Sequence, residues 1–223
     1  MVEYGPMTFW QRMLDLVWPR TCEVCGRPVD REGRYICSEC LNRIPFIRPG
    51  DGVYEIEDAA SAVRFECETR RMILDYKFNR HLWLKADFAD WMEAAACARF
   101  DLAAVDVVLP MPTTAYNRLD HGYNQCDFLA EDLARRIDRR SSRRVLARKG
   151  HPARQSGLDE EARRENVKGT FAVRRPELVR GRTVLLVDDI MTTGATLAEC
   201  GRELKASGAA RVWSVTLARS VRT

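Results

Sequence analysis

Long apolar runs are missing from this chain of 223 residues. No stretch approaches the ~20 apolar residues that a membrane-spanning helix needs. The N-terminus mixes charged and apolar side chains, unlike a secretory signal. Hydrophobic residues make up 46% and charged residues 30%, which excludes a disordered or fibrous protein. We expect a globular, cytoplasmic protein with one full domain and a small appendage, since a domain takes about 150 residues.

Both common glycine-rich nucleotide motifs are also missing. The sequence has no Gly-x-x-x-x-Gly-Lys-Ser/Thr loop and no Gly-x-Gly-x-x-Gly fingerprint. Its three histidines, His81, His121 and His151, are too scattered to predict a general base. Trp83 and Trp91 suit a core better than a base-stacking platform. The function must therefore be sought in other motifs.

Positive charge is concentrated in one part of the chain. The stretch Arg135–Arg182 holds 16 Lys and Arg against 6 Asp and Glu, a net charge of +10 in a chain of +4. Such a stretch indicates an anionic partner, such as phosphate, pyrophosphate or nucleic acid. A solvated, arginine-rich surface is the alternative.

The first 20 residues predict an amphipathic helix, which Pro19 ends. We expect this helix to dock on its own protein, and a membrane-surface or partner helix is the alternative. Its apolar residues at helical spacing are Phe9, Met13, Leu14, Leu16, Val17 and Trp18.

Two Cys-x-x-Cys pairs follow, Cys22 with Cys25 and Cys37 with Cys40, separated by eleven residues. Four thiolates around tetrahedral Zn²⁺ can hold together a segment too short to build a core. A redox pair is the alternative, but two close copies favour structural zinc in a ribbon over residues 21–58. Four thiolates leave no open position for catalytic water. The other cysteines, Cys67, Cys97, Cys126 and Cys200, belong to no pair and are interpreted as reduced thiols in the core or near the surface.

From residue 59 to 223 strands alternate with helices, which predicts an α/β domain with a mostly parallel sheet flanked by helices. The continuous apolar run Thr183–Val187 is typical of a buried parallel strand. The other expected strands are Ser61–Phe65, Val105–Leu109, Val145–Ala147 and Arg211–Ala218, and the expected helices are Arg70–Phe78, Ala86–Ala98, Cys126–Ile137 and Ala195–Ala206.

The segment Thr183–Thr196 carries the most chemistry. The strand ends at Asp188 and Asp189, and a small-residue turn with Gly194 then opens a helix. The turn's N–H groups and threonine hydroxyls attract a phosphate, and the carboxylates accept hydrogen bonds from hydroxyls. A ribose 5-phosphate satisfies both. The alternatives are an Mg²⁺ site of the receiver type, which would not explain the turn, and a capped helix with acidic neighbours.

This segment resembles the phosphoribosyl pyrophosphate (PRPP) signature of type I phosphoribosyltransferases. The order of motifs, from about Leu14 to Arg219, resembles the ComF family of bacteria, which joins a double zinc ribbon to a phosphoribosyltransferase-like domain. In that family an arginine typically precedes Gly-Tyr-Asn-Gln, whereas His121 stands here. The motifs between the cysteines and the signature are Leu109–Pro112, Arg118, Gly122–Gln125, Arg154–Gln155 and Arg164–Asn166.

The resemblance implies displacement of pyrophosphate from ribose C1 by a nitrogen nucleophile, with Mg²⁺. It also implies single-stranded DNA and the DNA-uptake machinery as candidate partners. It makes the loop after Leu109 the pyrophosphate loop and Lys149–Gly169 a mobile lid, for which a surface loop is the alternative. The implied PRPP-binding residues are Asp188, Asp189, Met191, Thr192, Thr193, Gly194, Ala195 and Thr196. The implied catalytic residues are Arg118, Arg154, Gln155 and Arg164, with a surface role as the alternative for Arg118.

Overall fold

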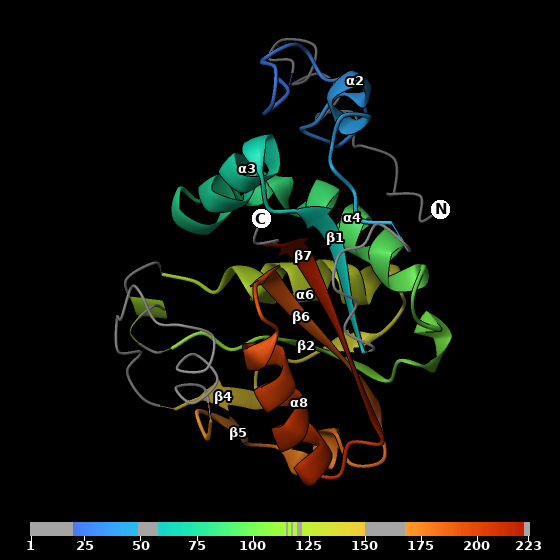
Figure 1. Ribbon diagram of the computed structural model, residues 1–223, viewed down its shortest axis with the longest axis vertical. Helices are drawn as coiled ribbons and strands as arrows, with labels where there is room; N and C mark the ends of the chain where they lie inside the picture. The colour runs from blue at the N-terminus through green and yellow to red at the C-terminus, as the bar shows by residue number, and fades with distance from the viewer. Residues whose placement is uncertain are drawn as a thin grey trace, which may run out of the picture.

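Five parallel strands form the central sheet of the protein. The computed structural model describes residues 20–48, 58–114, 116, 118–119, 122–149 and 168–220. The strands lie in the order β1-β7-β6-β2-β3 (Figure 1), and every neighbouring pair is parallel, as expected for an α/β domain. Their bounds are β1 Ala59–Arg64, β2 Val107–Pro110, β3 Arg140–Ser141, β6 Thr183–Met191 and β7 Arg211–Arg219.

Helices cover both faces of this sheet because its strands are apolar on both sides. Leu185 and Val187 of β6 join a core with α4 and α6, whereas Val184 and Leu186 join a second core with α8. The alternation follows from the two-residue period of a strand. The helices are α2 Ser38–Leu41, α3 Cys67–Phe78, α4 Lys85–Cys97, α6 Gln125–Arg136 and α8 Ala195–Ala206, with 3-10 turns at Leu82–Leu84, Leu102–Ala104 and Pro176–Leu178.

Two strand predictions differ from the structure. The strand expected at Val145–Ala147 is β4 (Leu146–Arg148), which pairs antiparallel with β5 (Phe171–Val173) outside the main sheet. The strand expected to end at Val187 continues to Met191, because β7 pairs with it over its whole length. The two acids therefore lie within a strand rather than after it.

The cysteine-rich segment is attached to the edge of the sheet. Phe46 bridges Val63 of β1 in antiparallel fashion, and the Ile47 N–H donates to the Ala62 carbonyl at 2.9 Å. The chain thus passes directly from the ribbon into pairing with the first strand.

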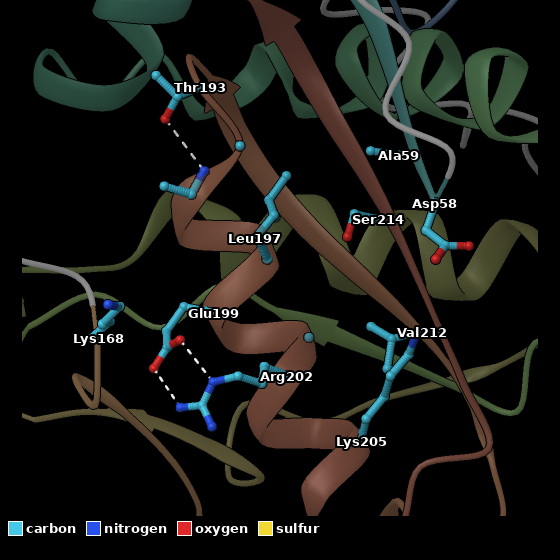
Figure 2. A pocket seen from close by; sticks show the side chains of 14 residues that line it. Asp58, Ala59, Lys168, Thr193, Leu197, Glu199, Arg202, Lys205, Val212 and Ser214 are labelled. Carbon is cyan, nitrogen blue, oxygen red and sulfur yellow. Dashed lines mark hydrogen bonds and ion pairs between the residues drawn. The ribbon is translucent and has the colours of Figure 1, made fainter. Parts of the chain in front are cut away.

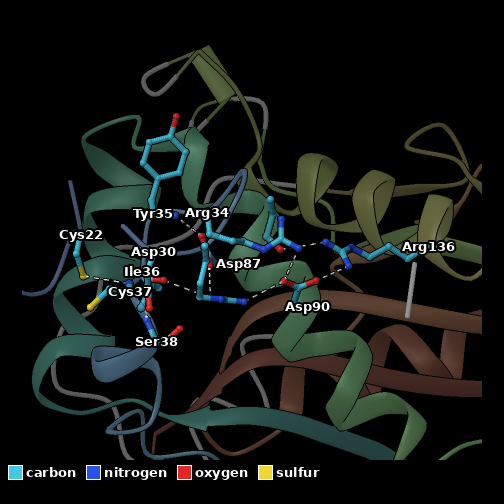
Figure 3. Close-up of polar contacts among 12 residues, drawn as sticks. Cys22, Asp30, Arg34, Tyr35, Ile36, Cys37, Ser38, Asp87, Asp90 and Arg136 are labelled. Atoms are coloured by element: carbon cyan, nitrogen blue, oxygen red, sulfur yellow. Dashed lines mark hydrogen bonds and ion pairs between the residues drawn. The ribbon is translucent and has the colours of Figure 1, made fainter. Parts of the chain in front are cut away.

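A buried carboxylate on α4 joins the ribbon to the larger domain (Figure 3). Asp87, which is 0% exposed, accepts hydrogen bonds from the Arg31 guanidinium at 3.1 Å and the Tyr35 N–H at 2.9 Å. One helical turn further, Asp90 accepts from Arg34 at 2.7 Å. Burial raises the pKa of Asp87 to about 6, so these donors from the ribbon offset the cost of its charge.

The two tryptophans assigned to the core differ. Trp91 is 4% exposed and packs edge-on against Phe46. Trp83 is 41% exposed, so its assignment to the core is wrong. It stacks on His81 at the ribbon junction, where no further element covers its outer side among the residues that the structure describes.

We predict that Asp87→Ala lowers the free energy of unfolding by about 3 kcal/mol, because it leaves the Tyr35 N–H without its acceptor and takes the main carboxylate partner from the half-buried Arg31 guanidinium. Chemical denaturation in zinc-containing buffer measures the change. Asp101→Ala is the control, since Asp101 is exposed and caps only the Ala103 N–H; it should cost about 1 kcal/mol. Equal losses in the two variants would contradict the role of Asp87.

Candidate functional site

The four paired cysteines converge on one point. Their sulfur atoms all lie within 4.8 Å of one another, and Cys25 Sγ is 3.8 Å from Cys37 Sγ. A tetrahedron with Zn–S bonds of about 2.3 Å has edges of about 3.8 Å. The Arg27 N–H and guanidinium lower the pKa of Cys25 to about 6, which favours the thiolate that zinc requires. The cluster fits structural zinc, as expected from the sequence.

The second acid of the signature is fully engaged by neighbouring side chains. Asp189 is 5% exposed, and its Oδ2 accepts from the Lys77 ammonium at 2.5 Å and the Gln125 amide at 2.7 Å. Its Oδ1 accepts from the Ile190 N–H at 2.7 Å. Burial opposes its ionisation, but Lys77 and Gln125 outweigh burial and lower the pKa of Asp189. This carboxylate is therefore a fixed anion.

The first acid has a different environment. Asp188 Oδ1 accepts from the Asp189 N–H at 2.9 Å and from the Cys126 thiol at 3.5 Å. Burial, followed by the neighbouring charge of Asp189, raises the pKa of Asp188 to about 7. Adjacent acids thus differ in protonation, and Asp188 is the one that can gain or lose a proton near neutral pH.

The Gly122–Gln125 motif joins the site's elements. The Tyr123 hydroxyl donates to the Tyr76 carbonyl of α3 at 2.9 Å. The Asn124 amide donates to the Met111 carbonyl after β2 at 3.0 Å, and its oxygen caps the N-terminus of α6. Because Gln125 then binds Asp189, this motif fixes α3, the loop after β2 and α6 around the acids.

The predicted phosphate turn lies between β6 and α8. Gly194 has φ +78°, a left-handed conformation that favours glycine, and Thr193 Oγ1 accepts from the Ala195 N–H at 3.3 Å. A cavity of about 700 Å³ adjoins the turn and extends along α8 to Asp58 and Ser214 (Figure 2). Asp188 and Asp189 are not among the described residues that line it.

The remaining predicted site residues fall in several places. Met191 is buried and Thr192 is exposed, while Thr196 is half-buried in the first turn of α8. Arg118 pairs with Asp127 of α6 at 3.2 Å rather than with either signature acid. Its catalytic role stays a prediction. Arg154, Gln155 and Arg164 lie outside the described residues.

Two participants were missed by sequence reasoning. Lys77 lies in the last turn of an ordinary amphipathic helix, and no motif surrounds it. Cys126 was expected to be a reduced core or near-surface thiol, and it is free and buried, but its contact with Asp188 at 3.5 Å was not foreseen. Its position directly after Gly-Tyr-Asn-Gln was the available signal.

Comparisons with known proteins agree with this two-part organisation. A double zinc ribbon domain matches residues 13–50, and a phosphoribosyl transferase domain matches residues 124–222. Competence protein F of Haemophilus influenzae is 32% identical over 154 residues, covering 67% of each chain. The chain belongs to the ComF family. The DNA utilization protein YhgH of Escherichia coli O157:H7 is 28% identical over 203 residues, covering 90% of this chain and 84% of its own.

Among solved structures, an allosteric regulatory enzyme of purine biosynthesis aligns with a TM-score of 0.41 and 16% identity, over 65% of this chain and 30% of its own.

Within the described part of this ComF protein, no helix has the length and apolarity that crossing a bilayer requires.

We predict that Asp188→Asn raises the melting temperature more at about pH 8 than at about pH 5. The pKa of Asp188 is about 7 in the folded protein and about 3.9 in the unfolded chain. The contribution of Asp188 to stability is therefore present below about pH 4 and is lost as the pH rises to about 7. The asparagine side chain of the variant does not ionise, so the variant avoids this loss.

Thermal unfolding of wild type and variant in the same buffers measures the difference. Asp106→Asn, at the opposite end of the sheet, is the control. An Asp188→Asn difference that is independent of pH would contradict the unequal protonation of the two acids.

Proposed function

We propose that this ComF protein binds PRPP with Mg²⁺ and transfers its phosphoribosyl group to a nitrogen acceptor, in the cytoplasm and in the context of DNA uptake or utilization. The single observation that carries the proposal is the pair Asp188 and Asp189 beside a left-handed, amide-rich turn at the carboxyl edge of a parallel sheet. Ligands of α/β proteins bind at this edge.

In this proposal the Thr192–Thr196 turn and the N-terminus of α8 bind the 5-phosphate, and Asp188 accepts from the ribose hydroxyls. Asp189 acts mainly as an anchor, because Lys77 and Gln125 occupy one of its oxygens. The C1–O bond breaks with its electron pair leaving on pyrophosphate, the acceptor nitrogen bonds to C1, and the acceptor's N–H proton passes to solvent. Positioning and charge stabilisation supply the catalysis.

The two signature acids differ in how well they can serve as ligands of Mg²⁺. Mg²⁺ keeps several waters and is held by one or two carboxylates together with substrate phosphates. Asp188 offers such a carboxylate, whereas the ammonium of Lys77 already neutralises Asp189. Asp188 would therefore hold the ion together with the phosphates of PRPP, and the bound ion would supply positive charge beside the pyrophosphate.

We predict that wild-type protein binds PRPP in the presence of Mg²⁺, and that Asp188→Asn weakens binding about tenfold or more, because a carboxylate accepts hydroxyl hydrogen bonds better than an amide. Isothermal titration calorimetry measures both affinities. The double variant Asp188→Asn/Asp189→Asn should bind no PRPP.

Asp188→Asn is the sharper test, since Asp189 also anchors α3 and α6. Asp106→Asn serves again as the control and should bind as wild type does. No heat with wild type, or unchanged heat in the double variant, would overturn the proposal.

A second candidate function is non-catalytic binding of single-stranded DNA, with the PRPP site as a nucleotide or phosphate sensor. It is favoured by an aromatic cluster where the ribbon and α3 meet. The cluster consists of the Tyr35, Trp83 and His81 rings, with the Arg20 guanidinium beside Tyr35. The Arg20 guanidinium lies 5.5 Å from the Tyr35 ring, Tyr35 lies 6.1 Å from Trp83, and Trp83 stacks on His81 at 4.4 Å. Aromatic side chains stack on unpaired bases of any sequence.

Positively charged side chains near the aromatic cluster also suit a nucleic acid. The exposed residues Arg71 and Arg80 flank it, and Arg71 donates to the Glu23 carbonyl at 2.7 Å. The Glu23 carboxylate accepts from the Trp83 indole N–H at 2.7 Å, which holds the ring in place. The same helix carries two acids, Asp75 and the exposed Glu68, and the Asp75 carboxylate accepts from the Asn79 side-chain amide at 2.8 Å. Arg71 and Arg80 are thus the exposed cations that a phosphate backbone could contact here.

We predict that the zinc-loaded chain binds a fluorescent oligo-dT at low salt, and that Trp83→Ala weakens this binding about fivefold or more through lost stacking. Fluorescence anisotropy measures the affinity. Arg80→Ala should reduce the salt dependence by about one ion, whereas Arg182→Ala, a matched charge change at the exposed residue before β6, should not. No binding at low salt, or equal affinity for a duplex of the same length, would eliminate this function.

A further inference from the structure

A second cavity, of about 770 Å³, adjoins the Gly122–Gln125 motif. It lies between the end of β2, one face of α6 and the short strand β3, and Tyr123 and Asn124 form part of its wall. The described residues that line it include neither Asp188 nor Asp189. The cavity is therefore distinct from the signature acids, and its size admits a small organic ligand.

Two arginines and a hydroxyl line the β3 side of the cavity. Arg139 and Ser141 are two residues apart along the extended chain, so their side chains lie on the same face of β3. Arg143 lines the cavity from the turn that follows. This arginine is exposed, and it forms no hydrogen bond or ion pair with any residue in the described ranges. Its guanidinium is thus available to a ligand.

Backbone carbonyls hold the Arg139 guanidinium in place. It donates to the carbonyls of Val105 at 2.6 Å, Asp138 at 2.8 Å and Ala103 at 3.0 Å, each time from a different nitrogen. Two of the five N–H groups of a guanidinium then remain. Carbonyl groups orient this cation without neutralising it. A fixed guanidinium beside a hydroxyl and a second arginine suits a phosphate.

Three acids also line the cavity, but they do not cancel its positive charge. Asp127 is paired with Arg118 at 3.2 Å and accepts from the Asn124 amide at 2.9 Å. Glu131 and Asp138 are exposed, so solvent and salt screen them. Four arginines against three acids leave one net positive charge among the lining residues. An anionic ligand therefore fits this cavity better than a cationic one.

The α6 side of the cavity offers aromatic surface. The Tyr123 and Phe128 rings both line it, with their centroids 5.9 Å apart and their planes at 57°. Phe128 is half-buried, yet it belongs to neither of the two cores that the described residues form. The Tyr123 hydroxyl donates to the Tyr76 carbonyl, which fixes its ring. Rings placed in this way can pack against a nucleobase.

We propose that this cavity binds a nucleoside 5′-phosphate, either free or at the end of a DNA strand. The phosphate accepts hydrogen bonds from Arg139, Ser141 and Arg143. The base packs against the Phe128 ring, which otherwise leaves apolar surface in a polar cavity. The inference goes beyond the proposed function, because this binding needs neither PRPP nor the signature acids.

Calorimetry with the zinc-loaded chain, in the absence of PRPP, tests the inference. AMP and thymidine 5′-monophosphate are the probes, and adenosine and thymidine are their neutral counterparts. We expect at least one nucleotide to bind about tenfold or more tightly than its nucleoside, because hydrogen bonds to a charged phosphate are strong. No binding of either nucleotide, or equal affinity for nucleotide and nucleoside, overturns the inference.

Substitutions at the two ends of the cavity locate the bound nucleotide. Arg143→Ala should weaken its binding about tenfold or more, and Phe128→Ala about fivefold or more. Arg144→Ala is the matched control, since Arg144 is the exposed neighbour of Arg143 and does not line the cavity. It should bind the nucleotide as wild type does. Equal affinity in wild type and Arg143→Ala places the nucleotide elsewhere and overturns the inference.

Asp188→Asn separates this cavity from the PRPP site. Nucleotide affinity that Asp188→Asn leaves unchanged and Arg143→Ala lowers supports the inference. Affinity that Asp188→Asn lowers and Arg143→Ala leaves unchanged assigns the nucleotide to the signature acids, which overturns the inference and leaves the proposed function standing. Failure of wild type to bind PRPP, with nucleotide binding retained, overturns the proposed function alone.

Oligonucleotides distinguish the two sources of the phosphate. An oligo-dT with a 5′-phosphate is compared with the same strand ending in a 5′-hydroxyl, by fluorescence anisotropy with a 3′ label. Tighter binding of the phosphorylated strand, removed by Arg143→Ala, assigns the cavity to strand ends. Equal binding of the two strands, together with binding of the mononucleotide, assigns it to free nucleotides.

Discussion

The contacts of the Asp189 carboxylate hold the candidate site together. One of its oxygens accepts from Lys77 at the end of α3 and from Gln125 at the start of α6, while the strand that carries it is central in the sheet. Three segments far apart in sequence meet at this atom. Because an unpaired buried carboxylate would be costly, its ionisation requires both donors to be in place. The geometry around Asp188 depends on that assembly.

The zinc ribbon is linked to the same assembly through α3. Glu23 lies between the first two zinc ligands, Cys22 and Cys25, and its carbonyl accepts from Arg71 of α3. Three residues before the end of that helix, Asp75 accepts from the Asn79 side chain, and the helix then presents Lys77 to the site. The short ribbon thus steadies a helix that carries one of the anchoring cations.

The features that could be predicted from the sequence are those that depend on the spacing of residues along the chain. The cysteine pairs and the apolar run into Asp188 indicate their roles by distance along the chain alone. Lys77 could not be found in this way, since its partner is more than a hundred residues away and its helix looks ordinary. Trp83 was misassigned because its exposure depends on how the ribbon docks. Arg118 was singled out by motif, but the structure gives it a partner on α6.

The position of Asp87 has an evolutionary consequence. This carboxylate belongs to the larger domain, yet the ribbon supplies its hydrogen bonds from Arg31 and the Tyr35 backbone. A recombination event that exchanged the ribbon for an unrelated module would leave the Asp87 carboxylate without these hydrogen-bond donors. We therefore expect the two modules to be inherited as one unit. A gene fusion that joins an unrelated module at their boundary would destabilise the larger domain.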